Sequence, residues 1–394
     1  MLAKAGTRSR PQALPKASGR WAWLAWLALL AVPLALAAPT YRIETVATGL
    51  DRPWSLAFLP DGRALLTEGA GRLRLLVPDG DGRLRLQAEA ITGLPDLYTE
   101  AQAGLFEVLP DPGFARNQLI YLSYATGTRQ ANHLRVVRAR LESGRLQDVQ
   151  PLFTSQPAKA FGQHFGARMA LLGDGTLAIA LGDGNVERTD AQRLDTHLGK
   201  IVRITRDGQV PADNPFIKRP GALPEIYSLG HRNPQGLVWV AERQTLYEHE
   251  HGSKVGDELN LIRSGANYGW PLTTGGVDYT GARISPFREL PGITPPLLEW
   301  TPSIAPAGLT WYDGQGFPAW RGSLFVAALR EKSVRRIPLV NGVPGPQELL
   351  FQELDQRLRD VRSGPDGNLW LLTDGEDGQL LRVVPIRAAA PERA

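Results

Sequence analysis

Residues 357–385 read RLRDVRSGPDGNLWLLTDGEDGQLLRVVP, and this stretch predicts the fold. Three apolar runs alternate with two tight turns, PDG at 365–367 and EDG at 376–378, and Asp and Gly are the residues that short hairpins use. The stretch therefore predicts three antiparallel strands. A similar segment, RPWSLAFLPDGRALLTEGAGRLRLLV, occupies residues 52–77 near the other end of the chain. Such self-similarity indicates a repeat architecture.

Four further copies of this pattern lie between the two segments, at residues 104–141, 166–208, 233–265 and 306–340. A small antiparallel sheet cannot bury both of its faces alone, whereas sheets repeated around an axis cover one another. We therefore predict an all-β fold, a six-bladed β-propeller of four-stranded antiparallel blades. The segment YRIETVATG at 41–49 is expected to close the ring as the outer strand of the last blade.

The composition is that of a folded protein and excludes several kinds of chemistry. The 394 residues are 43% hydrophobic and 21% charged, and 42 Gly and 31 Pro are spread along the chain as turn formers. The absence of cysteine excludes disulfides, thiolate nucleophiles and iron–sulfur ligation. Any redox activity therefore requires a bound cofactor.

The N-terminal residues have the pattern of an export signal. A basic stretch is followed by an apolar run at 21–38 and by a small-x-small cleavage site, Ala35-Leu36-Ala37. We predict a signal peptide at 1–37, one propeller domain at 38–387 and a short tail at 388–394, with the mature protein in the periplasm or secreted. The alternative is an uncleaved anchor, because the apolar run is just long enough to cross a bilayer.

The formal net charge of +4 has a local origin in this N-terminal segment. The segment holds five basic and no acidic residues, and without it the chain has 39 basic and 40 acidic residues. A nucleic-acid partner therefore has no electrostatic support. No second apolar run long enough to span a membrane follows, so we expect no stable membrane span after cleavage. We also expect the protein to be a monomer.

The propeller geometry brings separated polar residues to one mouth of the central channel. The innermost strands all run in the same direction, so the residues at their starts meet there, and the ends of the second strands return to the same face. The residues at the starts are Gln102, His164, Arg232, Asn233, Arg357 and Arg359. Those at the ends are Asp183, His251, Gly252 and Arg330. Several arginines at one mouth suit a ligand with several carboxylates, which guanidinium groups bind bidentately.

Six motifs resemble those of the soluble aldose sugar dehydrogenases, in the glucose/sorbosone dehydrogenase family. They are QHFGAR (163–168), PADNPF (211–216), GHRNPQG (230–236), EHG with DELN (250–260), NYGWP (267–271) and RLRDV (357–361). The resemblance covers nearly all of the predicted domain. It implies a six-bladed propeller that binds pyrroloquinoline quinone (PQQ) and Ca²⁺. It also implies oxidation of aldose sugars at the anomeric carbon to lactones, with an unidentified electron acceptor, a quinone or a cytochrome.

The resemblance implies a role for each matching residue. His164 is the implied general base, and imidazole suits this role because its ordinary pKa of about 6.5 leaves it largely neutral. Arg232 is implied to face the reacting quinone oxygen. The other implied cofactor contacts are Gln102, Asn233, Arg330, Arg357 and Arg359.

Two calcium sites are also implied by the resemblance. The backbone carbonyls of Gly252 and Ser253 would bind the cofactor's calcium, and the Glu258 carboxylate and the Tyr268 carbonyl would bind a second, structural ion.

Three residues depart from the family pattern. Ala167 replaces the second glycine of His-x-Gly-Gly-Arg, and we expect the extra methyl group to be tolerated. Arg330 stands where the family has lysine, which keeps the charge but changes its geometry. Ser253 replaces the proline of the calcium turn and loses the preset φ angle.

Two alternative functions fit the same fold. A calcium-dependent lactonase-type hydrolase would hold one metal with carboxylate and Asn ligands, and it would give the arginines no role. A non-catalytic secreted propeller that binds protein or glycan would not need His164 and three arginines on one rim.

The remaining histidines and Trp270 have simpler interpretations. His249 and His251 form a His-x-His pair, but a third metal ligand at suitable spacing is missing. Trp270 either packs at its turn or walls the sugar site. Structural or surface positions are expected for His133, His197 and His231.

Overall fold

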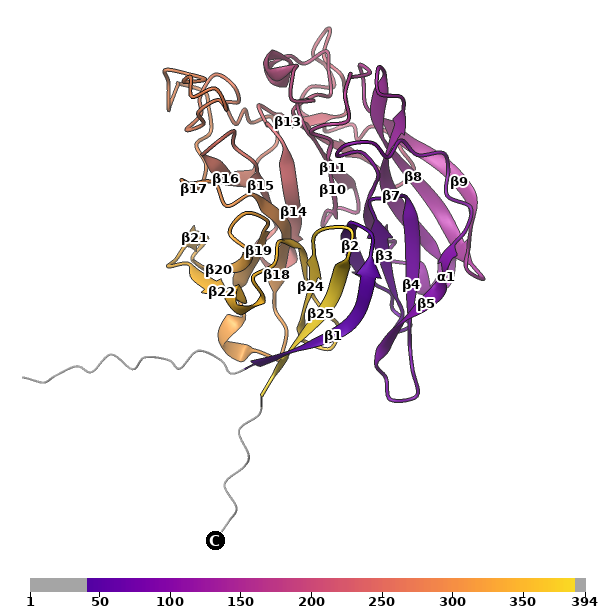
Figure 1. Cartoon of the computed structure of the whole chain (residues 1–394). Helices are drawn as coiled ribbons and strands as arrows, with labels where there is room; N and C mark the ends of the chain where they lie inside the picture. The colour runs from indigo at the N-terminus through magenta and orange to yellow at the C-terminus, as the bar shows by residue number, and fades with distance from the viewer. Residues whose placement is uncertain (1–40, 387–394) are drawn as a thin grey trace, which may run out of the picture. The chain divides into compact units, whose positions relative to one another are not determined.

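The computed structural model describes residues 41–386 and confirms an all-β propeller of six blades. Each blade is an antiparallel sheet of four strands, and the fifth sheet has one additional short strand (Figure 1). The predicted signal peptide at 1–37 and the tail at 388–394 lie outside the described residues. No helix within 41–386 combines the length and the hydropathy that a membrane crossing requires.

Consecutive strands form the first three blades. The first contains β2 (Pro53–Phe58), β3 (Ala64–Glu68), β4 (Arg72–Pro78) and β5 (Leu84–Ile91). The second contains β6 (Leu105–Pro110), β7 (Leu119–Gly127), β8 (Asn132–Glu142) and β9 (Arg145–Thr154). The third contains β10 (Gly166–Leu171), β11 (Leu177–Leu181), β12 (Lys200–Ile204) and β13 (Ile226–Leu229).

The fourth and fifth blades continue this order. The fourth contains β14 (Pro234–Val240), β15 (Thr245–Glu250), β16 (Asp257–Ile262) and β17 (Leu298–Trp300). The fifth contains β18 (Pro306–Tyr312), β19 (Ser323–Ala328), β20 (Ser333–Val340), β21 (Val343–Pro344) and β22 (Glu348–Leu350). The helices are short: α1 (Phe114–Asn117), η1 (Arg188–Gln192), η2 (Ala241–Arg243), η3 (Pro318–Trp320) and η4 (Gln352–Leu354).

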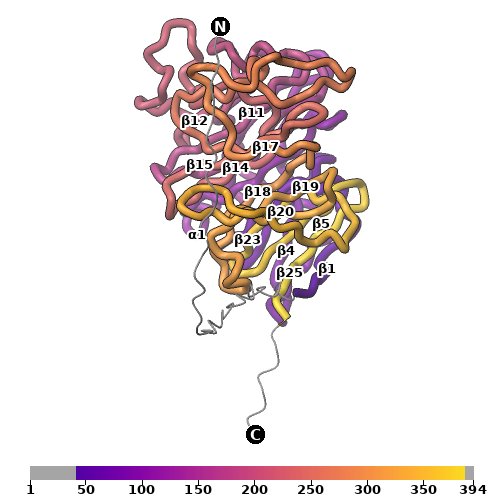
Figure 2. The backbone as a smooth tube through the Cα atoms, turned by 90° about the vertical axis from the view of Figure 1, so that its left-hand side faces the viewer, coloured from indigo at the N-terminus to yellow at the C-terminus, as the bar shows by residue number. Residues whose placement is uncertain are grey.

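The sixth blade joins the two ends of the described chain, as predicted for residues 41–49. Its three inner strands are β23 (Leu358–Ser363), β24 (Leu369–Thr373) and β25 (Gly378–Pro385), and its outer strand is β1 (Tyr41–Leu50). β1 pairs antiparallel with β25, and both views show the two strands side by side (Figures 1 and 2). Hydrogen bonds between strands therefore close the ring.

The hydrophobic core is divided into six clusters, one between each pair of neighbouring blades. One cluster packs Leu56 and Leu66 of the first blade against Leu372 and Leu380 of the sixth, together with Leu50 of β1. Each sheet thus buries both faces only because a neighbour lies on either side. This explains why the repeat pattern in the sequence predicts the fold.

A buried network of charges joins the innermost strands near the axis. Arg168 of β10 lies 3.0 Å from Glu107 of β6 and 3.3 Å from Asp360 of β23. Arg362 of β23 pairs with the same two carboxylates, at 2.6 Å and 2.7 Å. Ser55 of β2 donates to Glu107 at 2.7 Å. We call Glu107, Arg168, Asp360 and Arg362 the axial charge network.

The network determines the charge state of Glu107. Burial alone would raise the pKa of this carboxyl, but Arg362 and Arg168 hold it below its ordinary value. Glu107 therefore stabilises the folded state above the pKa of the unfolded chain, and this stabilisation is lost as the pH falls through the lower folded value.

We predict that Glu107→Gln lowers the free energy of unfolding at pH 7 by about 3–5 kcal/mol, because it leaves buried guanidinium charge uncompensated. Glu44→Gln is the matched control, since Glu44 pairs with Arg42 at the surface and such pairs contribute about 0–1 kcal/mol. Urea denaturation of both variants measures the difference. Equal losses would contradict a stabilising role for the network.

Candidate functional site

A cavity of about 560 Å³ opens around the axis at the starts of the innermost strands, and we call it the axial cavity. It brings together seven of the residues predicted from the sequence, whereas Asp183 and Gly252 do not line it. The seven are Gln102, His164, Arg232, Asn233, His251, Arg357 and Arg359. Arg330 is exposed in the turn after β19 and is not part of the cavity lining, although the adjacent Leu329 is. The propeller geometry therefore explains most of the predicted convergence.

His164 is held in the loop that precedes β10. Its φ angle is 47°, in the left-handed region that non-glycine residues rarely adopt, and such strain is often found at functional sites. Its backbone N–H donates to Gln102 Oε1 at 3.0 Å. The side chain is 8% exposed, so the ring contacts the cavity while most of it is protected from solvent.

Asp183, just after β11, fixes the orientation of the His164 ring. Asp183 Oδ1 lies 2.7 Å from His164 Nδ1, so Nδ1 carries the proton and the neutral ring keeps its lone pair on Nε2. Burial lowers the pKa of His164, and the hydrogen bond to Asp183 partly offsets this effect. The arrangement is that of a neutral general base with an orienting carboxylate.

Trp270 contributes to the same arrangement from the fourth blade. Its indole Nε1–H donates to Asp183 Oδ2 at 2.8 Å, while the backbone N–H of Asn185 donates to Oδ1 at 2.8 Å. Trp270 is buried and does not line the axial cavity. Sequence reasoning missed its contact with Asp183.

Arg232 is held by backbone carbonyls and not by a carboxylate. Its Nη1 donates to the carbonyl of Gly252 and, at 3.2 Å, to that of His251. The guanidinium carbon lies 5.2 Å from the centre of the Trp270 ring. Arg232 is 3% exposed and lines the cavity, so its positive charge acts in a largely water-excluded place.

Arg357 and Arg359 share one carboxylate, which the sequence analysis did not identify. Arg357 Nε lies 2.8 Å from Asp374 Oδ2, and Arg359 Nη2 lies 2.9 Å from Oδ1. Burial raises the pKa of Asp374, but Arg359 and Arg357 together hold it below its ordinary value. Asp374 therefore reduces the repulsion between these two arginines. Asp374 lies in a Thr-Asp-Gly turn, so its sequence signal is that of an ordinary turn residue.

A second buried cation lies behind the cavity wall. Lys159 Nζ is 3.5 Å from the centre of the Phe165 ring and donates to Asn132 Oδ1 at 2.9 Å. Burial lowers the pKa of Lys159 to about 7. Its charge also contributes to the low pKa of His164. The sequence offered no signal for this lysine.

The predicted calcium donors near the cavity fit a hard cation. Gly252 and Ser253 are buried, and Ser253 Oγ has no hydrogen-bond partner. The carbonyl of Gly252 already accepts the Arg232 guanidinium, which shows that positive charge is favoured at this oxygen. Backbone carbonyls are ordinary calcium ligands. These residues would hold the ion through their carbonyl oxygens.

The second predicted calcium site lies beside another cavity. Glu258 and Tyr268 line a cavity of about 370 Å³, together with Glu299, the strand partner of Glu258. Burial and the nearby Glu250 raise the pKa of Glu258 well above its ordinary value. A bound cation would relieve this accumulation of carboxylates, so the donors fit calcium.

The other histidines make hydrogen-bonding contacts. His251 Nε2 lies 2.7 Å from the Pro306 carbonyl, and His249 Nε2 lies 3.5 Å from that of Gly308. Neither belongs to a group of metal-ligating side chains in the described residues. His133, His197 and His231 all lie within hydrogen-bonding contacts.

Ala167 occupies a strained position next to the site. Its φ angle is 75°, where glycine is favoured, and its side chain is fully buried. The extra methyl group is thus accommodated in the structure, at the cost of a left-handed backbone. Its carbonyl accepts the Ser123 hydroxyl at 2.7 Å.

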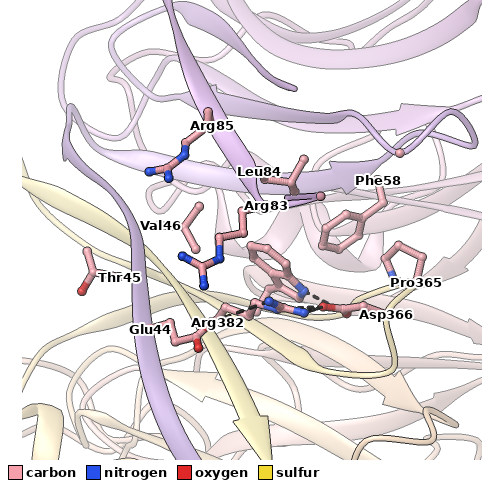
Figure 3. A pocket seen from close by; sticks show the side chains of 13 residues that line it. Glu44, Thr45, Val46, Phe58, Arg83, Leu84, Arg85, Pro365, Asp366 and Arg382 are labelled. Atoms are coloured by element: carbon pink, nitrogen blue, oxygen red, sulfur yellow. Dashed lines mark hydrogen bonds and ion pairs between the residues drawn. The ribbon is translucent and has the colours of Figure 1, made fainter. Parts of the chain in front are cut away.

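A separate cavity of about 350 Å³ lies where the sixth blade meets the first (Figure 3). Its wall includes Arg382, which pairs with Asp366 at 2.8 Å, and Arg85, which pairs with Asp79 at 2.9 Å. None of the residues predicted to bind cofactor or substrate lines it. The axial cavity is therefore the stronger candidate for a reaction site.

Comparison with known proteins agrees with this geometry. Aldose sugar dehydrogenase YliI of Escherichia coli (strain K12) is 40% identical over 357 residues, which are 89% of this chain and 94% of the relative. The crystal structure of the soluble aldose sugar dehydrogenase from Escherichia coli in the apo-form has a TM-score of 0.84, with 38% identity, and the match covers 88% of this chain and all of that chain.

The PQQ-bound form of aldose sugar dehydrogenase from Streptomyces coelicolor has a TM-score of 0.68 and 28% identity, covering 88% of this chain and 99% of that chain. The model of the Glucose / Sorbosone dehydrogenase family matches residues 50–382. The chain therefore belongs to the glucose/sorbosone dehydrogenase family and is a sugar dehydrogenase of the oxidoreductase class.

Proposed function

We propose that this chain oxidises aldose sugars at the anomeric carbon to lactones, in a reaction that depends on PQQ and Ca²⁺. The observation that carries the proposal is the His164–Asp183 pair in a cavity that also presents Arg232, Arg357 and Arg359. A base and a group of anion-binding donors meet in one place. The relatives named for aldose oxidation and for bound PQQ support the same conclusion.

His164 supplies the proton acceptor in this reaction. Nε2 takes the proton of the anomeric hydroxyl while the hydrogen on the anomeric carbon leaves as a hydride, and a carbon–oxygen double bond forms. When bound, PQQ supplies the electrophile that accepts the hydride and its two electrons. Arg232 would stabilise the negative charge that the bound cofactor acquires when it takes up the hydride.

The remaining residues orient the bound ligand. Arg357 and Arg359 retain guanidinium N–H groups beyond those bound to Asp374, and these groups suit the carboxylates of PQQ. Gln102 and Asn233 add neutral donors from two other blades. In this proposal Arg330 contacts the cofactor from the edge of the cavity, because it is exposed next to Leu329, which lines the cavity.

The proposed partners follow from the same chemistry. The substrate is an aldose, and the electrons pass to an acceptor that is either a quinone or a cytochrome. We place the protein in the periplasm or outside the cell, as a monomer without nucleic-acid or stable membrane partners. Tyr279 is exposed and lines the cavity, and we propose that the loop at 272–298, which contains it, influences which sugar is accepted.

The hydrolase alternative has less support from the site. Among the described residues, the one group of three metal-ligating side chains, His231, Glu248 and Glu250, is buried and does not line the axial cavity. A lactonase would need such ligands where its substrate binds. The arginines would then have no function.

We predict that the full chain, supplied with Ca²⁺ and PQQ, reduces an artificial electron acceptor when glucose or another aldose is added. His164→Ala should lower kcat by about 10²–10⁴-fold, because the proton acceptor is lost, and should keep PQQ binding. His133→Ala is the control, since His133 contacts the Ser155 carbonyl outside the cavity. Dye reduction and PQQ titration provide the two measurements.

Failure of PQQ to bind in the presence of Ca²⁺ would overturn the proposed function. Lactone hydrolysis without PQQ would favour the hydrolase, and binding of protein or glycan without either activity would favour the non-catalytic propeller.

We predict that Asp183→Asn lowers kcat by about a hundredfold or more, because His164 loses its orienting acceptor, with a smaller effect on KM. Because Asp183 raises the pKa of His164, this variant should also lower that pKa further. NMR titration of the His164 ring measures the shift. A His164 titration that stays the same would contradict the pairing.

A further inference from the structure

A second group of ionisable side chains lies inside the fourth blade and has no role in the proposed reaction. Glu248 and Glu250 are two residues apart on β15, so they share one face of the sheet. Asn260 of β16 lies opposite Glu248, and His231 precedes β14. All four residues are at most 3% exposed. Ligand atoms of His231, Glu248 and Glu250 lie within 4.8 Å of one another.

Three polar atoms in this group have no hydrogen-bond partner. They are His231 Nδ1, Glu248 Oε1 and Asn260 Oδ1. A buried polar atom without a partner costs about 1–3 kcal/mol, and folded proteins retain few of them. Three such atoms in one group indicate that a partner belongs among them.

The missing partner is a positive charge. Within residues 41–386, neither Glu248 nor Glu250 forms an ion pair with an arginine or a lysine. The basic side chain within 4 Å of Glu250 is His231, whose Nδ1 lies 3.5 Å from Glu250 Oε1 and carries charge only if the ring is protonated. Glu258, the strand partner of Glu250, adds a further carboxylate nearby. Buried carboxylates without compensating charge are unfavourable.

The surrounding hydrogen bonds orient the group as a metal site does. The Ser228 hydroxyl lies 2.9 Å from His231 Nε2 and can accept an Nε2–H; in that tautomer the lone pair is on Nδ1, which faces Glu250. Asn260 Nδ2 donates to Glu248 Oε2 at 3.1 Å and leaves Oε1 free. Outer hydrogen bonds of this kind fix the tautomer and direction of metal ligands.

We propose that His231 Nδ1, Glu248 and Glu250 bind a divalent transition-metal ion, such as Zn²⁺ or Mn²⁺. One imidazole nitrogen with two carboxylates is a ligand set that these ions accept, whereas Ca²⁺ prefers oxygen ligands alone. None of these three ligands is one of the proposed calcium donors, which are Gly252, Ser253, Glu258 and Tyr268, although Glu258 and Tyr268 are neighbours of the site. It does not depend on the proposed function.

The ion would also support the axial cavity. Glu250 Oε2 accepts the backbone N–H groups of Arg232 and Asn233, the second at 3.2 Å. Tyr268 stacks on the His231 ring, with 4.8 Å between the ring centres. An ion on Glu250 would therefore hold the segment that presents Arg232 to the cavity.

The test uses the full chain without a polyhistidine tag. Bound metal is first removed with a chelator, and saturating Ca²⁺ is then added so that the proposed calcium sites are filled. Titration with Zn²⁺ or Mn²⁺, followed by calorimetry and metal analysis after gel filtration, should show one high-affinity ion per chain and a higher Tm. Glu248→Gln and His231→Gln should weaken binding at least tenfold. Glu142→Gln and His133→Gln, at positions outside the site, should bind as the unchanged protein does.

A spectroscopic measurement on the unchanged protein covers the case in which a variant does not fold. X-ray absorption of the Zn²⁺-loaded chain should show one imidazole nitrogen among oxygen ligands. An all-oxygen or multi-imidazole shell would overturn the proposal, as would binding of Ca²⁺ alone or equal binding by the four variants. A metal-free protein that Glu248→Gln stabilises would show that a proton occupies the site instead.

Discussion

The innermost strands of all six blades contact the axial charge network, and the arrangement of the blades around the axis depends on these contacts. Arg168 also donates to the Gln235 carbonyl of β14 at 2.8 Å. In β18, a Cβ on Gly308 would lie 2.1 Å from Asp360 Oδ1, so the fifth blade approaches too closely for any side chain. Buried charges are tolerated only when they are paired. Displacement of β6, β10 or β23 would leave a charge unpaired, and the network therefore restricts how these three blades are arranged.

The functional site is a consequence of that geometry. The ring centre of Trp54, which lines the axial cavity, lies 3.9 Å from the guanidinium carbon of Arg168. The wall of the cavity therefore packs against the axial charge network. Residues just before the innermost strands are outside the regular hydrogen-bond ladder, and they can adopt unusual backbone angles, as His164 does. The blades hold these angles because they fix both ends of each loop.

The sequence predicted the parts of this structure that depend on local chemistry. Asp-Gly turns and apolar runs identified the six blades and the closing strand at 41–49, and ring symmetry placed His164 and Arg232 together. The contact of Asp183 with Trp270 joins two blades through side chains, and no local pattern encodes it. The sequence around Asp374 is typical of an ordinary turn, so it does not indicate a partner for the arginines. The position of Arg330 depends on the conformation of the turn after β19.

The arginines of the axial cavity differ in how far each can move toward a ligand. Arg357 and Arg359 are bound to Asp374, and displacing them would leave a largely buried carboxylate without its partners. They are therefore fixed donors. Arg232 is held by neutral carbonyls, so its guanidinium can turn toward a developing negative charge without leaving a buried anion unpaired. The backbone of Arg232 meanwhile stays anchored to Glu250. Stabilisation of a transient oxyanion requires donors that are already oriented, and these contacts hold the Arg232 guanidinium at the cavity before any charge develops there.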